Sequence, residues 1–156
     1  MQKALETRTK FIELIGMVTQ AEGLPRISGR ILGLLIFDGR PYAFGELATE
    51  LQVSRGSISS NVRMLAERGA IERVAKPGNR QDYYQICENP YDSILSGIAQ
   101  RAEKTATDIA QIAGQLPPEM AQASRRVADY ASFYGVLAEG IRLATQKAKT
   151  RSSGDQ

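Results

Sequence analysis

The chain has 156 residues, 42% of them hydrophobic, which is enough for one ordinary domain or for a small domain with an added oligomerisation element. Twenty Lys and Arg against seventeen Asp and Glu leave a formal charge of +3, which permits binding to a nucleic acid or another anionic surface without establishing it. The sequence has no His and one cysteine, so the usual general base and zinc ligands are missing, and we expect no catalysis, no cofactor and no metal site.

The same inventory predicts the compartment. A lone cysteine, Cys87, cannot form an internal disulfide, which fits a reducing cytoplasm and a buried structural thiol. The longest apolar stretch, residues 31–37, is too short to span a bilayer, and the first ten residues lack the apolar core of a signal peptide. We therefore expect a soluble cytoplasmic protein.

Helical spacing of apolar residues predicts an amphipathic helix over residues 3–22, stopped by Gly23. Its apolar stripe consists of Phe11, Leu14, Ile15 and Val18. A second helix is expected from Pro25 to about Phe37, where Gly29 and Gly33 predict that another backbone approaches closely. Its apolar stripe consists of Ile27, Ile31, Leu34 and Leu35.

Turn chemistry at residues 38–41 separates these helices from a short extended segment, residues 42–44, and from a third helix, Gly45 to Leu51. Ser54 is then a candidate N-cap for a fourth helix, which ends near Arg68 before Gly69. A tight turn over residues 52–54 joins these two helices.

The fourth helix divides into two faces. Ile58, Val62 and Leu65 fall together and must face the core, whereas the opposite face carries small and charged residues. The residues of that outer face are Gly56, Ser60, Arg63 and Glu67, flanked by Ser57 and Ser59. Small hydroxyl residues let a helix backbone approach a surface closely, as in a major groove, although a plain solvated face has the same composition.

Two β-like runs, residues 71–74 and 81–86, predict a hairpin whose tip has Pro77 and Gly78 at the central positions of a type II turn. Between Ser54 and Ile86 the chain carries six basic and three acidic residues, so the whole formal excess of +3 lies in the fourth helix and this hairpin. That distribution favours nucleic-acid binding over a solvated face.

Residues 23–86 resemble the winged-helix domain of MarR-type regulators, most closely the GbsR branch. The resemblance is carried by the segments at 24–30, 53–59 and 78–84. It implies that the helix after Ser54 enters the major groove of DNA and that Arg80 in the wing approaches the minor groove. The expected fold class is mainly α with a small β-hairpin wing, in which a winged helix-turn-helix domain is joined to a helical dimerisation domain.

The C-terminal third has a different pattern. One set of residues repeats with alternating spacings of four and three, as at the a and d positions of packed helices: Tyr91, Leu95, Ile98, Ala102, Thr105, Ile109, Ile112 and Leu116. After Pro117 and Pro118, a second set recurs every seven residues: Met120, Val127, Tyr134, Ile141 and Ala148. The pattern predicts an antiparallel helical hairpin, which would expose apolar surface unless it packs on a second copy of the chain.

These patterns predict four segments: a dimerisation helix (1–22), a winged helix-turn-helix domain (23–88), a helical hairpin for dimerisation (89–150) and a disordered tail (151–156). The predicted function is a homodimeric, sequence-specific transcriptional regulator of double-stranded DNA, acting as a repressor. Candidate DNA contacts are Ser54, Arg55, Gly56, Ser57, Ser59, Ser60, Arg63, Lys76, Asn79 and Arg80, with Arg26 and Arg30 as backbone contacts or structural ion pairs. The alternative is a winged helix that serves as a protein-interaction module or scaffold and does not bind DNA.

The resemblance also implies an effector, because the GbsR branch includes sensors of choline-like quaternary ammonium compounds. Such cations bind to aromatic faces, and the candidate rings are Tyr91, Tyr130, Phe133 and Tyr134. The sequence has no Trp, so a cage would need Tyr and Phe alone. Core packing of these rings is the alternative.

Overall fold

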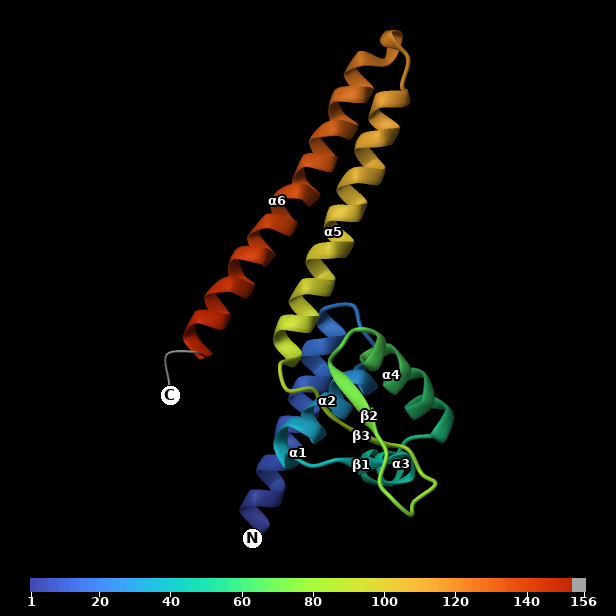
Figure 1. The fold of residues 1–156 in the computed structure, drawn as a ribbon, viewed down its shortest axis with the longest axis vertical. Helices are drawn as coiled ribbons and strands as arrows, with labels where there is room; N and C mark the ends of the chain where they lie inside the picture. Colours follow the sequence, from blue (N-terminus) through green and yellow to red (C-terminus); the bar gives the residue numbers. More distant parts are fainter. Residues whose placement is uncertain (153–156) are drawn as a thin grey trace. The chain divides into compact units, whose positions relative to one another are not determined.

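The computed structural model describes residues 1–152, and the chain divides into two compact units, one from Met1 to Pro90 and one that begins at Tyr91 (Figure 1). The first unit contains α1 (Gln2–Ala21), α2 (Arg26–Asp38), β1 (Tyr42–Ala43), α3 (Phe44–Leu51), α4 (Arg55–Glu67), β2 (Ile71–Val74) and β3 (Tyr83–Ile86). The second is built from α5 (Pro90–Gln115), the short 3-10 helix η1 (Pro118–Met120) and α6 (Ala121–Ser152). The predicted fold class, mainly helical with a small antiparallel sheet, is confirmed.

Helices α1 and α2 pack with their backbones in close contact, as the glycines of α2 predict. A Cβ atom on Gly29 would lie 2.5 Å from the carbonyl oxygen of Ile15, and one on Gly33 would lie 3.1 Å from the Cα of Ile12. Gly29 therefore requires a residue without a side chain, and a Cβ on Gly33 would require the α1 backbone to shift by a few tenths of an ångström. Gly16 of α1 lies against α2 side chains, since its Cβ would lie 2.7 Å from the Cγ of Arg30, and this position was not predicted.

The face that α1 buries differs from the predicted stripe. Ile12, Gly16 and Thr19 are buried, whereas Leu14 and Val18 are 52% and 45% exposed. The glycines of α2 let the α1 backbone approach closely. The α1 residues that face these glycines are therefore the buried ones. The larger apolar side chains of α1 are therefore left on a second, outward face.

The core of the winged helix-turn-helix lies between α2, α3, α4 and β2. Its fully buried large side chains are Ile31, Leu34, Leu35, Leu47, Leu51, Ile58 and Ile71. The predicted core stripes of α2 and α4 are confirmed at these positions, and Val62 and Leu65 are also buried. Gly39, with φ 60°, ends α2 in the left-handed conformation, which glycine adopts more readily than other residues.

The three strands form one antiparallel sheet in the order β1-β3-β2. Tyr83 of the central strand pairs with Ala43 of β1 and with Val74 of β2. Strand β3 begins at Tyr83 and not at Gln81 as predicted, because the Gln81 amide donates to the side chain of Asn79 at 3.1 Å. Helix α3 begins one residue before the predicted Gly45.

In the second unit, α5 and α6 form the predicted antiparallel hairpin (Figure 1). Glu103 pairs with Arg142, and Asp92 lies 3.7 Å from Lys149, which sets how the two helices align. The buried positions of this unit hold small residues: Ala99, Ala102, Ala113, Ala131, Ala138 and Thr145. The large residues expected in the seam are half-buried or exposed, as Tyr91 and Ile112 show, because small side chains let the helices approach closely.

Helix α6 extends through Ser152, two residues into the segment predicted as a tail, and the rest of that segment lies outside the described residues. Between residues 1 and 152 no helix combines the length and the apolar character that crossing a membrane requires. Cys87, predicted as a buried thiol, is half-buried, and this burial raises the pKa of the thiol.

Candidate nucleic-acid interface

Helix α4 begins with the cap that the sequence predicts. The Ser54 hydroxyl oxygen accepts a hydrogen bond from the Ser57 backbone N–H at 3.1 Å. Because the core holds the other side of α4, Gly56, Ser60 and Arg63 are exposed to solvent. The helix therefore presents an outer face of small and basic side chains.

The serines of α4 and the neighbouring Asn61 differ in burial and in how they use their polar groups. Ser57 and Ser59 are half-buried, and the Ser60 hydroxyl lies 3.2 Å from the Ser57 carbonyl, to which it donates. The Ser60 oxygen keeps its acceptor capacity toward solvent. Asn61, which the sequence analysis did not single out, is buried and donates from its side chain to the Ser57 carbonyl at 2.7 Å.

Arg55 lies at the first turn of α4, where its guanidinium carbon is 4.9 Å from the centroid of the Phe44 ring. Stacking on an aromatic face restricts the directions that this exposed cation can take. The guanidinium borders an open polar pocket of about 440 Å³, lined by Gly45, Glu46, Thr49, Glu50, Arg55 and Gln81. Two carboxylates in that lining make it a poor site for a free anion.

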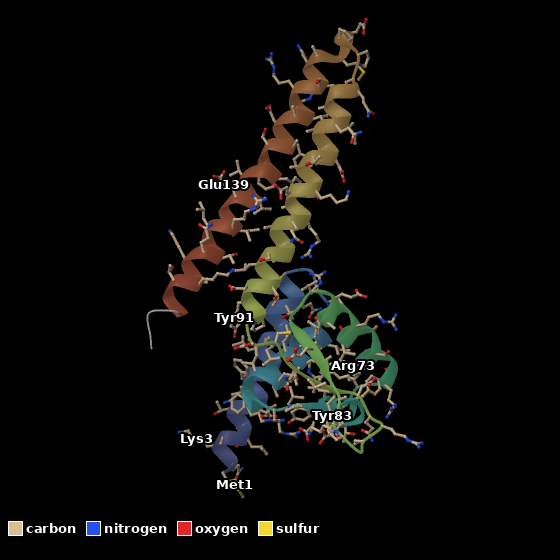
Figure 2. All side chains as sticks on the ribbon, in the orientation of Figure 1. Met1, Lys3, Arg73, Tyr83, Tyr91 and Glu139 are labelled. Carbon is tan, nitrogen blue, oxygen red and sulfur yellow. The ribbon has the colours of Figure 1, made fainter. Side chains whose placement is uncertain are left out.

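The wing turns as predicted between Lys76 and Asn79. The Asn79 backbone N–H donates to the Lys76 carbonyl at 3.1 Å, and Gly78 has φ 78°, as the third position of a type II turn requires. Arg73 forms an ion pair with Asp82 at 3.3 Å. Arg80 is exposed and has no ion-pair partner among residues 1–152, so it is a free cation at the wing tip. Figure 2 labels Arg73 of β2 and Tyr83 of β3, the strands that flank the wing.

Arg26 and Arg30 of α2 both bind Glu13 of α1. Each has a guanidinium nitrogen 2.7 Å from a different Glu13 carboxylate oxygen. Burial alone would raise the pKa of Glu13, but its hydrogen bond to Arg26 and the charge of Arg30 outweigh burial and lower that pKa. This arrangement favours structural ion pairs over contacts to the DNA backbone for these two residues.

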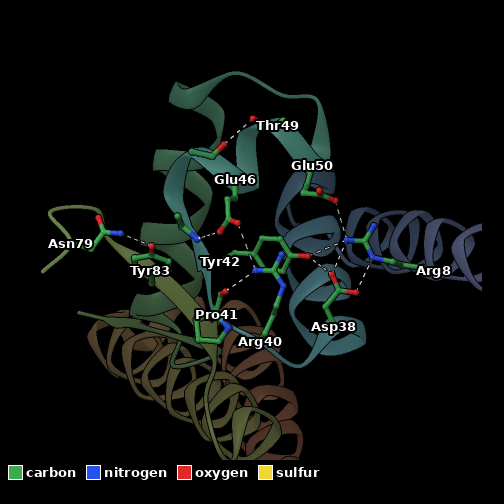
Figure 3. A network of polar contacts seen from close by, with 12 residues as sticks. Arg8, Asp38, Arg40, Pro41, Tyr42, Glu46, Thr49, Glu50, Asn79 and Tyr83 are labelled. Atoms are coloured by element: carbon green, nitrogen blue, oxygen red, sulfur yellow. Dashed lines mark hydrogen bonds and ion pairs between the residues drawn. The ribbon is translucent and has the colours of Figure 1, made fainter. Parts of the chain in front are cut away.

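A polar network that sequence analysis missed joins α1 to the start of the sheet (Figure 3). Arg8 binds both carboxylate oxygens of Asp38, at 2.8 and 2.7 Å, and donates to the Tyr42 hydroxyl at 3.2 Å and to Glu50 at 3.1 Å. The Tyr42 hydroxyl donates in turn to Asp38. The hydrogen bond from Arg8 is the main cause of the lowered pKa of Asp38.

The structure brings three of the four candidate effector rings together. Tyr130, Phe133 and Tyr134 are neighbours on α6, with ring centroids 5.3 to 6.3 Å apart. Tyr91 precedes Asp92, which pairs with Lys149, so Tyr91 lies about 20 Å along the hairpin from Tyr134 at 1.5 Å per residue. No cage within one chain can therefore contain all four rings.

The helix pair α3–α4 and the adjoining hairpin define the first unit as a winged helix-turn-helix, the fold of many transcriptional regulators. No protein-family model matches the chain. It is 34% identical over 146 residues to the HTH-type transcriptional regulator MmpR5 of Mycobacterium tuberculosis, which covers 88% of this chain and 87% of MmpR5. The chain belongs to this family of HTH-type transcriptional regulators.

Two further comparisons agree with that membership. The HTH-type transcriptional repressor OpcR of Bacillus subtilis is 27% identical over 96 residues, which is 62% of this chain and 52% of OpcR. A solved crystal structure of a transcriptional regulator superposes with a TM-score of 0.77 at 28% identity, over 92% of this chain and 99% of that one. These relatives are regulators and not enzymes, in line with the expected absence of catalysis.

Proposed function

We propose that the chain is a homodimeric repressor that binds specific sites on double-stranded DNA. The observation that carries this proposal is that Gly56, Ser60 and Arg63 of α4 are exposed and that the wing, whose strand β2 contacts α4, carries the unpaired Arg80. Small residues allow the α4 backbone to approach base edges, and free cations can replace the counterions of phosphates. Repression is favoured because the relative OpcR is a transcriptional repressor.

In this proposal α4 lies in the major groove and the wing lies along the adjacent backbone and minor groove. The groove contacts come from Arg55, Ser59, Ser60 and Arg63, while Lys76 and Arg80 contact phosphate or the minor groove. The Ser54 cap leaves the first amides of α4 directed toward a phosphate, where helix N-termini favour negative charge. Arg26 and Arg30 act through Glu13 as structural supports.

Arg63→Ala and Arg80→Ala are expected to weaken binding to the operator without unfolding the protein, since both side chains are exposed and unpaired within residues 1–152. Loss of a base-edge contact by Arg63 should cost about 1–3 kcal/mol and relax sequence preference. Loss of a phosphate contact should lower the slope of log K against log salt by about one. Fluorescence anisotropy over a salt series measures both quantities.

Arg125→Ala is the matched control, because it removes an exposed cation from α6, far along the chain from the wing. Its isotherms should overlay those of the wild type. Unchanged affinity for both Arg63→Ala and Arg80→Ala would contradict this docking mode. A wild-type protein with no salt-dependent affinity for any duplex would instead favour the scaffold alternative.

The dimer is proposed from apolar surface that one chain leaves exposed. On α6 the exposed large residues are Tyr130, Phe133, Val136, Leu137 and Leu143, and on α1 they are Leu5, Leu14, Met17 and Val18. Monomeric proteins rarely expose large contiguous apolar patches, and a second copy of the chain would cover these helices. Two copies would also place two α4 helices for successive major grooves, about 34 Å apart.

Sedimentation velocity at micromolar concentration should show a wild-type dimer. Phe133→Glu with Val136→Glu should shift it to a folded monomer, because both side chains are more than half exposed in one chain and would be charged inside the interface. Gln122→Glu adds charge to an exposed position of the same helix and should leave the dimer intact. A folded wild-type monomer at these concentrations would contradict the proposal.

Membership of the GbsR branch and a quaternary ammonium effector stay predictions of the resemblance. The cluster of Tyr130, Phe133 and Tyr134 offers aromatic faces to such a cation, but its exposure on α6 fits the dimer contact equally well. The separation of Tyr91 from that cluster favours dimer packing.

A further inference from the structure

Tyr83 lies at the base of the wing and contacts two residues of its tip. The Tyr83 hydroxyl oxygen accepts a hydrogen bond from the Asn79 side-chain amide at 2.7 Å (Figure 3). The Lys76 ammonium lies 4.2 Å from the centroid of the Tyr83 ring. The backbone of Tyr83 is paired on both sides, with Ala43 and with Val74. One half-buried ring on the central strand therefore connects both ends of the wing turn to the sheet.

The side chain of Asn79 is used at both ends. Its Nδ2 atom donates to Tyr83, and its Oδ1 atom accepts from the Gln81 backbone N–H at 3.1 Å. Its own backbone N–H closes the turn on the Lys76 carbonyl. The Asn79 side chain thus bridges residues 80–82, which connect the turn to β3. It restricts the backbone at Arg80, which lies between Asn79 and Gln81.

Lys76 is similarly constrained. An ammonium over an aromatic face is attracted by the ring, so the Lys76 side chain is held against Tyr83 while it remains exposed to solvent. Arg80 is the one basic side chain of the segment 76–80 for which the described residues offer no ion pair and no aromatic face. Asn79 and Lys76 are thus held against Tyr83, whereas Arg80 projects from the wing without such a contact.

We infer that Tyr83 is a positioning residue for DNA binding: it orders the wing turn through Asn79 and Lys76, so that Arg80 projects in a fixed direction. This inference rests on the proposed function. Ordering before binding matters because an ordered wing loses less conformational entropy when Arg80 makes its contact. The Tyr83 ring itself need not contact DNA.

Three variants of the full-length chain test the inference. Tyr83→Phe removes the acceptor for Asn79 and keeps the ring under Lys76, whereas Tyr83→Leu removes both. Tyr84→Phe is the matched control, because it deletes the same hydroxyl one residue away, and the Tyr84 hydroxyl has no hydrogen-bond partner among residues 1–152. Thermal unfolding identifies any variant that fails to fold, and Tyr83→Phe is conservative enough to serve as the decisive one.

The first measurement is made without DNA, by ¹⁵N relaxation of the Gly78 and Arg80 amides. Order parameters near the rigid value of about 0.85 are expected in the wild type and in Tyr84→Phe, a lower value in Tyr83→Phe, and a value below about 0.6 in Tyr83→Leu. Unchanged order parameters in both Tyr83 variants would overturn the inference, whatever the protein binds.

The second measurement is DNA affinity at fixed salt. Loss of one neutral hydrogen bond predicts a Kd about three- to tenfold higher for Tyr83→Phe and no change for Tyr84→Phe. The effect should disappear in an Arg80→Ala background, because Tyr83 acts through the position of Arg80. An equal loss in both backgrounds would show that Tyr83 acts independently of Arg80 and would overturn the positioning role. Absence of DNA binding by the wild type would instead refute the proposed function, and the relaxation data would still decide whether Tyr83 orders the wing.

Discussion

Gly29→Ala is expected to destabilise the fold by about 3 kcal/mol, the upper range for an overpacked interior. The added Cβ would lie 2.5 Å from both the Ile15 carbonyl oxygen and the Thr19 hydroxyl oxygen. A backbone carbonyl inside α1 cannot move away independently, so α1 and α2 must separate. That loss exceeds the gain of about 1 kcal/mol that Ala brings to a helix interior relative to Gly.

Two other glycines provide the comparison. A Cβ on Gly33 would lie 3.1 Å from the Ile12 Cα, so Gly33→Ala should have a smaller effect of the same sign. Gly114 of α5 has open space around it, so Gly114→Ala should stabilise by up to about 1 kcal/mol. Urea unfolding at one protein concentration measures all three free energies. A Gly29→Ala protein as stable as the wild type would show that the helices are not in the close contact described.

Features specified by neighbouring residues were predictable from the sequence. The Ser54 cap, the Pro77–Gly78 turn and the buried stripe of α4 each depend on residues within about one turn of one another, and all three are present. The glycines of α2 also predicted a close backbone approach, though not which face of α1 would meet them. Periodicity identifies an apolar face but not its partner.

Features that depend on distant partners were not predictable. Arg8 is 30 residues from Asp38 and 42 residues from Glu50, and no local pattern links them. The side-chain hydrogen bonds of Asn61 and Tyr83 were not predictable for a related reason. A polar residue in a helix or strand has the same local sequence pattern whether its side chain is solvated or hydrogen-bonded within the protein. Of the buried alanines between α5 and α6, only Ala102 was in the predicted seam, because the heptad pattern gives weight to large residues.

Arg8→Met is expected to lower the free energy of unfolding by about 2–3 kcal/mol at neutral pH. Arg8 and Asp38 are only 20% and 16% exposed, so the substitution leaves a largely desolvated carboxylate without its cation. The cost lies below that of a fully buried pair because solvent reaches part of the network and Tyr42 still donates to Asp38. Arg8→Lys keeps the charge but cannot bind both carboxylate oxygens, so it should fall between Arg8→Met and the wild type.

The pH dependence of this difference identifies Asp38 as the partner. Hydrogen bonding to Arg8 lowers the pKa of Asp38 below its ordinary value of 3.8, against the opposite effect of burial. A carboxyl with a lowered pKa in the folded state stabilises the fold above that ordinary value, and the stabilisation is lost as the pH falls through the folded-state pKa. The difference in unfolding free energy between wild type and Arg8→Met should therefore be full at pH 6 and should shrink progressively below about pH 4.

Lys10→Met, which removes an exposed cation from the same helix, should change stability by less than about 0.5 kcal/mol at either pH. If Arg8→Met and Lys10→Met have equal free energies of unfolding at pH 6, the network does not stabilise the junction of α1 with the sheet.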